Sequence, residues 1–174
     1  MILETERLIL RKMTQADYPD LCEILQDQET MRAYEHAFDD EEAQAWLDKQ
    51  LERYEKDGFG LLACVLKEGG KMIGQCGLTM QDTPDGELVE IGYLFNRAYW
   101  HNGYAIEAAA ACKKYAFGQL KLPSVCSIIR DSNLASQNVA IKNGMELAGG
   151  FTKHYRGVDM PHLIFMAFRE EPKE

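Results

Sequence analysis

The stretch that decides the fold is Glu87-Leu-Val-Glu-Ile-Gly-Tyr-Leu-Phe-Asn-Arg-Ala-Tyr-Trp-His-Asn-Gly-Tyr-Ala105. It predicts an apolar strand over 87–95 that runs through a short loop into an alanine-rich helix. Such a junction binds anions, because the first N–H groups of a helix lack internal acceptors and the helix dipole adds partial positive charge. Gly103 would let the backbone approach a pyrophosphate closely. The spacing is equally consistent with a glycine that only eases a tight turn.

The segments on either side of this junction change between strand and helix periodicity. Before it, we predict a strand over Arg7–Met13, a helix from a capping Asp17 to about Gln26, a helix between Asp39 and Gly58, and strands over Gly60–Lys67 and Lys71–Met80. After it, we predict a helix over Tyr104–Leu120, a strand over Ser124–Ile129, a helix over Leu134–Asn143, and strands near Met145–Phe151 and His162–Arg169. This order indicates an α+β fold with helices on the faces of a mixed sheet, not a doubly wound nucleotide-binding sheet.

Composition bounds the class of protein. A chain of 174 residues with 46% hydrophobic content can bury one core, so we expect a single domain over 1–174 with a frayed tail at 170–174. The net charge of −9 disfavours nucleic-acid partners and suits an amine. Apolar runs are only strand-sized and the first ten residues carry Glu4, Glu6 and Arg7, so we expect no membrane partner and a cytoplasmic protein.

Cysteine and histidine spacing gives no sign of a metal site. The cysteines are odd in number and mostly embedded in apolar runs, which predicts buried free thiols at Cys22, Cys64, Cys76, Cys112 and Cys126. No CxxC pair occurs, and the four histidines are too scattered to form a preformed zinc site. We therefore expect no metal.

Four segments together resemble the GNAT superfamily of acetyltransferases, in the branch of the ribosomal-protein N-terminal (alanine/serine) acetyltransferases. They are Glu4-Thr-Glu-Arg-Leu-Ile-Leu-Arg11, Glu90-Ile-Gly-Tyr93, Trp100-His-Asn-Gly-Tyr-Ala-Ile-Glu-Ala108, and Asn133-Leu-Ala-Ser136 with Lys142-Asn-Gly-Met145. They occur in the family's order across nearly the whole chain. The resemblance implies a mixed, mostly antiparallel twisted sheet flanked by helices, with a splayed central strand pair.

The resemblance also implies a site for acetyl-CoA as co-substrate. Leu94 and Phe95 would expose backbone groups at a splayed strand edge, opened by a β-bulge, where the pantetheine arm pairs like an added strand. The loop residues His101, Asn102, Gly103, Tyr104 and Ala105 would hold the pyrophosphate. Asn133 and Ser136 would lie beside the distal pantetheine and the thiol.

Two residues are candidates for catalysis. Strand alternation places Glu90 opposite the apolar side chains of its strand, and it could act as the general base that deprotonates the amine, directly or through a water. It could equally be a carboxylate paired with a basic neighbour. The resemblance points to Ser136 as the donor of a proton to the leaving thiolate, although Ser132, Asn133 and Ser136 are also typical helix-capping types. Of these, we expect Ser132 to be the cap and Asn133 to have a mixed role. Many family members carry a tyrosine where this chain has Ala140. The hydroxyls of Tyr93, Tyr99 and Tyr104 are other sources for this proton, although each residue fits better as a packing aromatic.

These observations predict an acetyl-CoA-dependent N-acetyltransferase that acetylates a primary amine by direct attack in a ternary complex. The acceptor would be a protein or peptide N-terminal α-amine, or a small amine. By analogy with the family, segments 34–40 and 153–162 would border the acceptor. One alternative is an antibiotic or polyamine acetyltransferase, and another, of a different class, is a non-catalytic CoA-binding sensor. Acyl preference stays open, as does a homodimer.

Overall fold

The computed structural model describes residues 2–155 and 157–170. The elements follow in the order β1 (Ile2–Glu4), β2 (Leu8–Lys12), α1 (Tyr18–Leu25), α2 (Asp40–Lys56), β3 (Leu61–Leu66), β4 (Met72–Thr83), β5 (Gly86–Phe95), α3 (Tyr104–Gly118), β6 (Ser124–Arg130), α4 (Leu134–Lys142), β7 (Glu146–Tyr155) and β8 (Val158–Phe168). Single 3-10 turns lie at η1 (Gln15–Asp17), η2 (Thr30–Tyr34) and η3 (Arg97–Tyr99). Most of the predicted tail, 170–174, lies outside the described residues.

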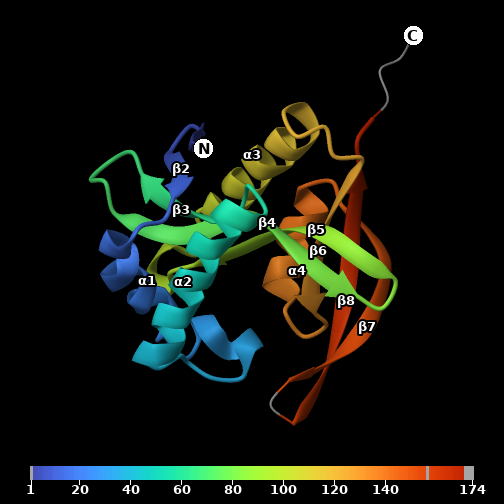
Figure 1. Cartoon of the computed structure of the whole chain (residues 1–174), viewed down its shortest axis with the longest axis horizontal. Helices are drawn as coiled ribbons and strands as arrows, with labels where there is room; N and C mark the ends of the chain where they lie inside the picture. Colours follow the sequence, from blue (N-terminus) through green and yellow to red (C-terminus); the bar gives the residue numbers. More distant parts are fainter. Residues whose placement is uncertain (1, 156, 171–174) are drawn as a thin grey trace.

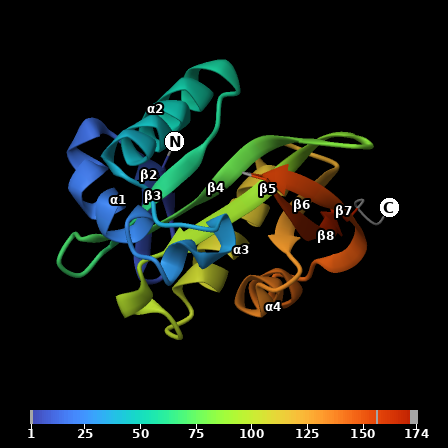
Figure 2. The ribbon, with the colours of Figure 1, turned by 90° about the horizontal axis from the view of Figure 1, so that it is seen from below.

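The strands form one sheet in the order β1-β2-β3-β4-β5-β6-β8-β7, and only the β5–β6 pair is parallel (Figure 1). Helices α1 and α2 cover one face of this sheet, and α3 and α4 cover the other (Figure 2). The predicted α+β class with a mixed, mostly antiparallel sheet is confirmed. Within the described residues, no helix is both long and apolar enough to cross a membrane.

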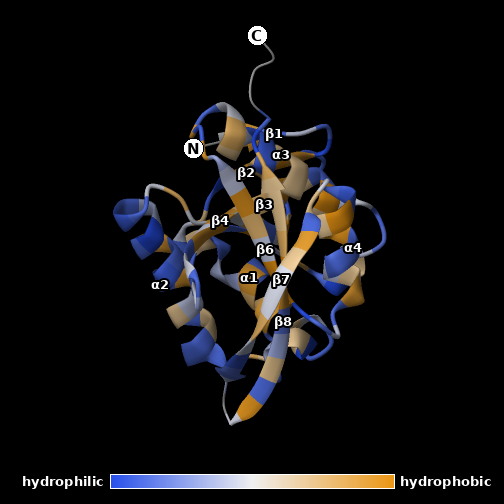
Figure 3. Cartoon of the chain, turned by 90° about the vertical axis from the view of Figure 1, so that its right-hand side faces the viewer, coloured by the Kyte–Doolittle hydropathy of each residue, from blue (hydrophilic) through white to orange (hydrophobic). Residues whose placement is uncertain are grey.

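Each face of the sheet carries its own hydrophobic cluster. One cluster joins α3 and α4 to the sheet through small side chains such as Ala108, Ala109 and Ala140. The other packs α1 and α2 on the opposite face around Leu21 and Leu47. Figure 3 shows hydrophobic residues along β3 and β6, mostly hydrophilic residues on the outer side of α2, and a mixture of both along α4. The alanines of α3 let the helix lie close to the sheet, which fixes where its N-terminus sits.

The centre of the sheet opens between β5 and β6. β5 pairs with β4 without interruption from Gly86 to Phe95, whereas its parallel pairing with β6 is recorded at Glu90 opposite Cys126. Beyond that point the two strands separate. The predicted splayed pair is therefore present, but the predicted bulge is wrong for the β4–β5 ladder. Register shifts occur instead between Cys64 and Val65 and between Leu147 and Gly149.

Several predicted boundaries and partners differ from the structure. β7 and β8 form a long hairpin, so most of the predicted loop 153–162 belongs to strands. Asp17 does not cap α1 through its side chain, because its carboxylate accepts from both Arg11 guanidinium N–H groups and from the backbone N–H of Thr14. Asp39 does cap α2, accepting from the Glu42 N–H. All five cysteines are free; four are buried, but Cys22 is only half-buried.

Candidate active site

A cavity of about 1400 Å³ lies where β5 ends, bounded by segment 28–37, the loop before α3 and the first turn of α4. It brings together eight of the predicted site residues: Leu94, Phe95, His101, Gly103, Tyr104, Ala105, Asn133 and Ser136. Asn102 and Glu90 do not line it. Asn102 instead holds the loop, because its amide nitrogen donates to the carbonyls of Tyr99 and Trp100.

The loop before α3 has the backbone shape of an anion cradle. His101 and Gly103 both have left-handed backbone angles, with φ of 62° and 81°. Gly103 is the N-cap of α3, so the first-turn amides that follow it have no acceptor within the helix. Such amides and the helix dipole suit a phosphate group. This part of the cavity therefore fits the pyrophosphate of a coenzyme without needing a lysine.

The open edge of β5 supplies a second set of backbone groups. The Ile91 carbonyl accepts from the Ser127 hydroxyl of β6 at 2.8 Å, and alternate residues of an antiparallel strand face opposite neighbours. Tyr93 and Phe95 consequently direct their backbone groups into the gap, whereas those of Leu94 face β4. The Phe95 carbonyl already accepts from the Trp100 indole N–H at 2.8 Å. The sequence placed the open groups on Leu94 and Phe95, so for Leu94 the geometry differs from expectation.

The first turn of α4 is held from two sides. Asn133 caps the helix by accepting from the Ser136 N–H at 3.2 Å, so the expectation that Ser132 is the cap is wrong. The Tyr93 hydroxyl crosses the gap and donates to the Ser136 carbonyl at 2.7 Å. Burial raises the pKa of Tyr93, and nearby Cys76 adds to the shift. The Tyr93 hydroxyl, which the sequence offered only as another source of a proton, is thus the link that keeps Ser136 at a fixed distance from β5.

We expect Tyr93→Phe to lower kcat about fivefold, because a lost hydrogen bond of about 1 kcal/mol loosens the turn that carries Ser136. Steady-state thiol release would measure it. Tyr54→Phe is the matched control, since it removes another buried hydroxyl that bonds only backbone, at Met13 and Leu61, away from the cavity. A kcat that falls equally in both variants would contradict the role given to Tyr93.

Glu90 lies on the α1/α2 side of β5, next to the gap. Its carboxylate accepts from the Ile128 backbone N–H at 3.2 Å and from the Thr79 hydroxyl at 3.4 Å. Burial raises the pKa of Glu90, and the charge of Lys153 and the two hydrogen bonds only partly oppose it. None of the ion pairs found among residues 2–155 and 157–170 includes Glu90. A carboxylate whose pKa is raised in this way takes up a proton more readily than an exposed one.

The cavity wall opposite α4 is formed by the segment after α1. Glu35, which has a left-handed φ of 71°, forms an ion pair with Arg130 at the end of β6, and both line the cavity. His36 and Ala37 also line it, whereas none of the residues that the structure describes within 153–162 does. Sequence reasoning missed the Glu35–Arg130 pair because 95 positions separate the two residues and no local pattern marks either one. Among the described residues, no group of His, Cys, Asp and Glu is placed to hold a metal ion.

Comparison with known proteins agrees with this geometry. The sequence profile described as "Acetyltransferase (GNAT) domain" matches residues 7–146. YkkB of Bacillus subtilis (strain 168), described as an uncharacterized protein, is 35% identical over 164 residues, covering 94% of this chain and 93% of its own. A GNAT-family acetyltransferase from Bacillus anthracis has a solved structure with a TM-score of 0.85 and 25% identity, covering 98% of this chain and 100% of its own.

A more distant structure shares the fold. RimL, described as a ribosomal L7/L12 alpha-N-protein acetyltransferase in complex with coenzyme A, superposes with a TM-score of 0.75 at 14% identity, covering 97% of this chain and 98% of its own. The family profile, the cradle before α3 and the opening between β5 and β6 all lead to one assignment. The chain is an N-acetyltransferase and belongs to the GNAT family.

Proposed function

We propose that this chain transfers an acetyl group from acetyl-CoA to a primary amine, with the whole of 1–174 acting as one catalytic unit in the cytoplasm. The observation that carries the proposal is the single cavity in which the helix cradle at Gly103, the open backbone edge of β5 and the first turn of α4 meet. These three features match, in order, a pyrophosphate, an extended amide-bearing arm and a reactive thioester. RimL, a protein of this fold, was solved with coenzyme A.

The residues divide the work of a direct transfer. The coenzyme brings the activated acetyl group when bound. Glu90, whose pKa burial raises, takes the proton of the incoming ammonium, directly or through a water. The backbone edge at Tyr93 and Phe95 holds the arm extended, and the Ser136 hydroxyl gives a proton to the departing thiolate. Ala140 stands where many family members have a tyrosine, but it has no hydroxyl. We therefore assign this step to the Ser136 hydroxyl of the same helix, α4.

For the acceptor, we propose a peptide or protein N-terminal α-amine. Support comes from RimL, a protein of this fold that is described as a ribosomal L7/L12 alpha-N-protein acetyltransferase. The carboxylates of the cavity wall add nothing to this choice, because Glu35 pairs with Arg130 and Glu29 pairs with Arg32, and all four residues line the cavity. A small polyamine or an aminoglycoside carries the same ammonium chemistry and is the second candidate. In a CoA-binding sensor without catalysis, neither Glu90 nor Ser136 would transfer a proton.

The test is calorimetric titration with acetyl-CoA and CoA, followed by thiol release with a panel of amines. The panel comprises peptides with N-terminal alanine or serine, spermidine and an aminoglycoside. We expect coenzyme binding and fastest release with a peptide. Fastest release with spermidine or the aminoglycoside selects the second candidate, and binding without any release selects the sensor. Absence of coenzyme binding overturns the proposal.

A further inference from the structure

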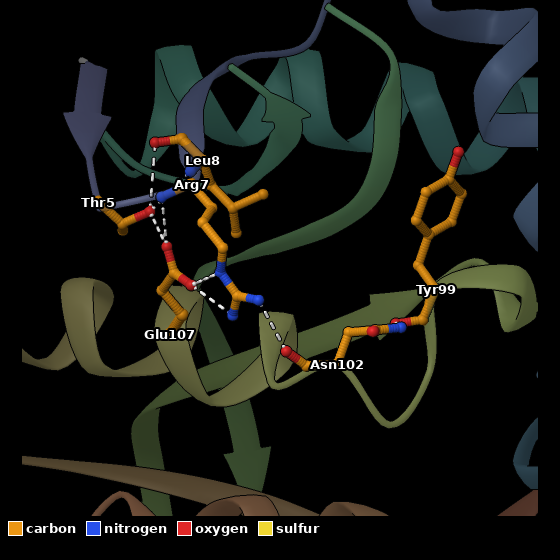
Figure 4. Close-up of polar contacts among 6 residues, drawn as sticks. All are labelled: Thr5, Arg7, Leu8, Tyr99, Asn102 and Glu107. Carbon is orange, nitrogen blue, oxygen red and sulfur yellow. Dashed lines mark hydrogen bonds and ion pairs between the residues drawn. The ribbon is translucent and has the colours of Figure 1, made fainter. Parts of the chain in front are cut away.

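Arg7 joins the N-terminal strands to the start of α3. Its Nε donates to Glu107 Oε2 at 2.7 Å and its backbone N–H donates to Glu107 Oε1 at 2.8 Å (Figure 4). The Thr5 hydroxyl donates to the same Oε1 at 2.5 Å. Glu107 sits in the first turn of α3, and its side chain is only 17% exposed. One carboxylate therefore fixes the segment before β2 to the helix that carries the anion cradle.

The same guanidinium also touches the cradle. Arg7 Nη1 donates to the Asn102 carbonyl at 2.9 Å, and the guanidinium carbon lies 4.3 Å from the centre of the Tyr104 ring. Arg7 thus contacts the residues on both sides of Gly103. In a trans peptide the C=O and the next N–H point in opposite directions. Holding the Asn102 carbonyl on Arg7 therefore turns the Gly103 N–H to the opposite side of the loop.

The charge of this arrangement depends on both partners. Burial by itself would raise the pKa of Glu107, but hydrogen bonds from Thr5 and Arg7 outweigh it and hold that pKa below its usual range. Glu107 is therefore a carboxylate at neutral pH, next to a cradle suited to an anion. An acidic side chain stabilises a helix N-terminus but repels a phosphate there. Arg7 neutralises this carboxylate while leaving the backbone N–H groups free.

We infer that Arg7 and Glu107 are positioning residues for the coenzyme pyrophosphate. Together they orient the 102–103 peptide, and Arg7 neutralises the Glu107 carboxylate at the start of α3, without either residue binding the ligand. The inference rests on the proposed use of acetyl-CoA. It makes the segment before β2 part of the coenzyme site. Arg7 and Glu107 are 100 positions apart in the sequence.

The decisive experiment compares two acetyl donors on Arg7→Met. S-Acetylpantetheine has the thioester and arm of acetyl-CoA but no pyrophosphate. We expect the Kd for acetyl-CoA to rise about tenfold, as expected for losing a charge-assisted hydrogen bond at the cradle. The KM for S-acetylpantetheine should change less than about twofold. An unchanged Kd, or an equal loss with both donors, would overturn the inference.

Two further variants separate positioning from folding. Arg7→Met/Glu107→Gln removes the uncompensated carboxylate and should recover part of the acetyl-CoA affinity. Should Arg7→Met fold poorly, Arg7→Lys keeps the charge without the guanidinium fork and should lie between wild type and Arg7→Met. No recovery in the double variant, or wild-type affinity for both Lys and Met, counts against the inference.

The matched control is Arg11→Met. Arg11 lies on β2, four residues after Arg7 but away from the cavity, and makes a two-point ion pair with Asp17 at 2.7 and 2.8 Å. We expect a lower Tm and an unchanged Kd for acetyl-CoA. A rise in Kd equal to that of Arg7→Met would show a general effect of destabilisation and would overturn the inference. If wild type binds no coenzyme, the proposed function itself fails; if wild type binds and Arg7→Met binds equally well, only the positioning role fails.

Discussion

Glu90→Gln should lower kcat/KM for the amine about 100-fold or more at pH 7, the range expected for loss of a general base. The amide keeps the size of the side chain and can accept from Ile128 and Thr79, so folding should be little affected. The pH profile gives the sharper test. Burial raises the pKa of Glu90, so the wild-type rate should climb with pH through a limb above the ordinary carboxyl range. That limb should be missing from Glu90→Gln.

Glu87→Gln is the matched control for this experiment. Glu87 lies on the same strand, but it is exposed. It stands opposite Asp82 in the strand register, in the outer part of the β4–β5 hairpin. Its variant should keep both the rate and the pH limb of wild type. A Glu90→Gln enzyme whose turnover is unchanged across pH would instead make Glu90 a structural carboxylate.

Gly103→Val should raise the Kd for acetyl-CoA about 100-fold, the equivalent of nearly 3 kcal/mol. The φ of Gly103 is +81°, a conformation that costs a β-branched residue more than the 1–2 kcal/mol typical of L-residues, so the loop must change shape. The added Cβ would also lie 3.5 Å from Nη2 of Arg7. Calorimetry on the purified variant measures the loss directly.

Gly69→Val separates strain from ligand contact. Gly69 has a nearly identical φ of +82°, lies in the turn between β3 and β4, and would place its Cβ in open space. We expect a similar fall in Tm for the two variants but normal coenzyme affinity for Gly69→Val. Equal affinity in Gly103→Val and wild type would remove the cradle from the coenzyme site.

Local patterns predicted the elements well where the chain itself marks their ends. The helix expected over Tyr104–Leu120 is observed as Tyr104–Gly118, because Gly103 and the alanine run define it locally. Strand ends were less predictable. β4 ends at Thr83 and β5 begins at Gly86, on either side of the Pro84-Asp85 turn, so both strands are longer than predicted. β7 continues beyond Phe151 to Tyr155, and β8 begins at Val158, before His162. A hairpin can extend through polar residues when both strands remain paired.

The candidate site was predictable where it depends on backbone shape and not where it depends on distant partners. The cradle at 101–105 and the turn at Ser136 came from short contiguous motifs. The Tyr93 hydroxyl meets a carbonyl 43 positions away, and Arg7 meets Glu107 across 100 positions. No periodicity encodes such pairs. Ser132 and Asn133 are both good capping types, so only the three-dimensional path of the loop decides between them.

The buried cysteines affect which nucleophiles can compete for the acetyl group. A transferase of this class releases a free thiol, coenzyme A, at every turnover, and any reactive protein thiol nearby could form a mixed disulfide or accept the acetyl group itself. Cys126 of β6 lies opposite Glu90 of β5 in the register of the parallel strand pair. Cys126 is fully buried, and burial together with the Glu90 charge raises its pKa to about 12. Because the thiolate is the reactive form, Cys126 stays chemically silent beside the proposed reaction centre, and the amine meets no sulfur competitor there.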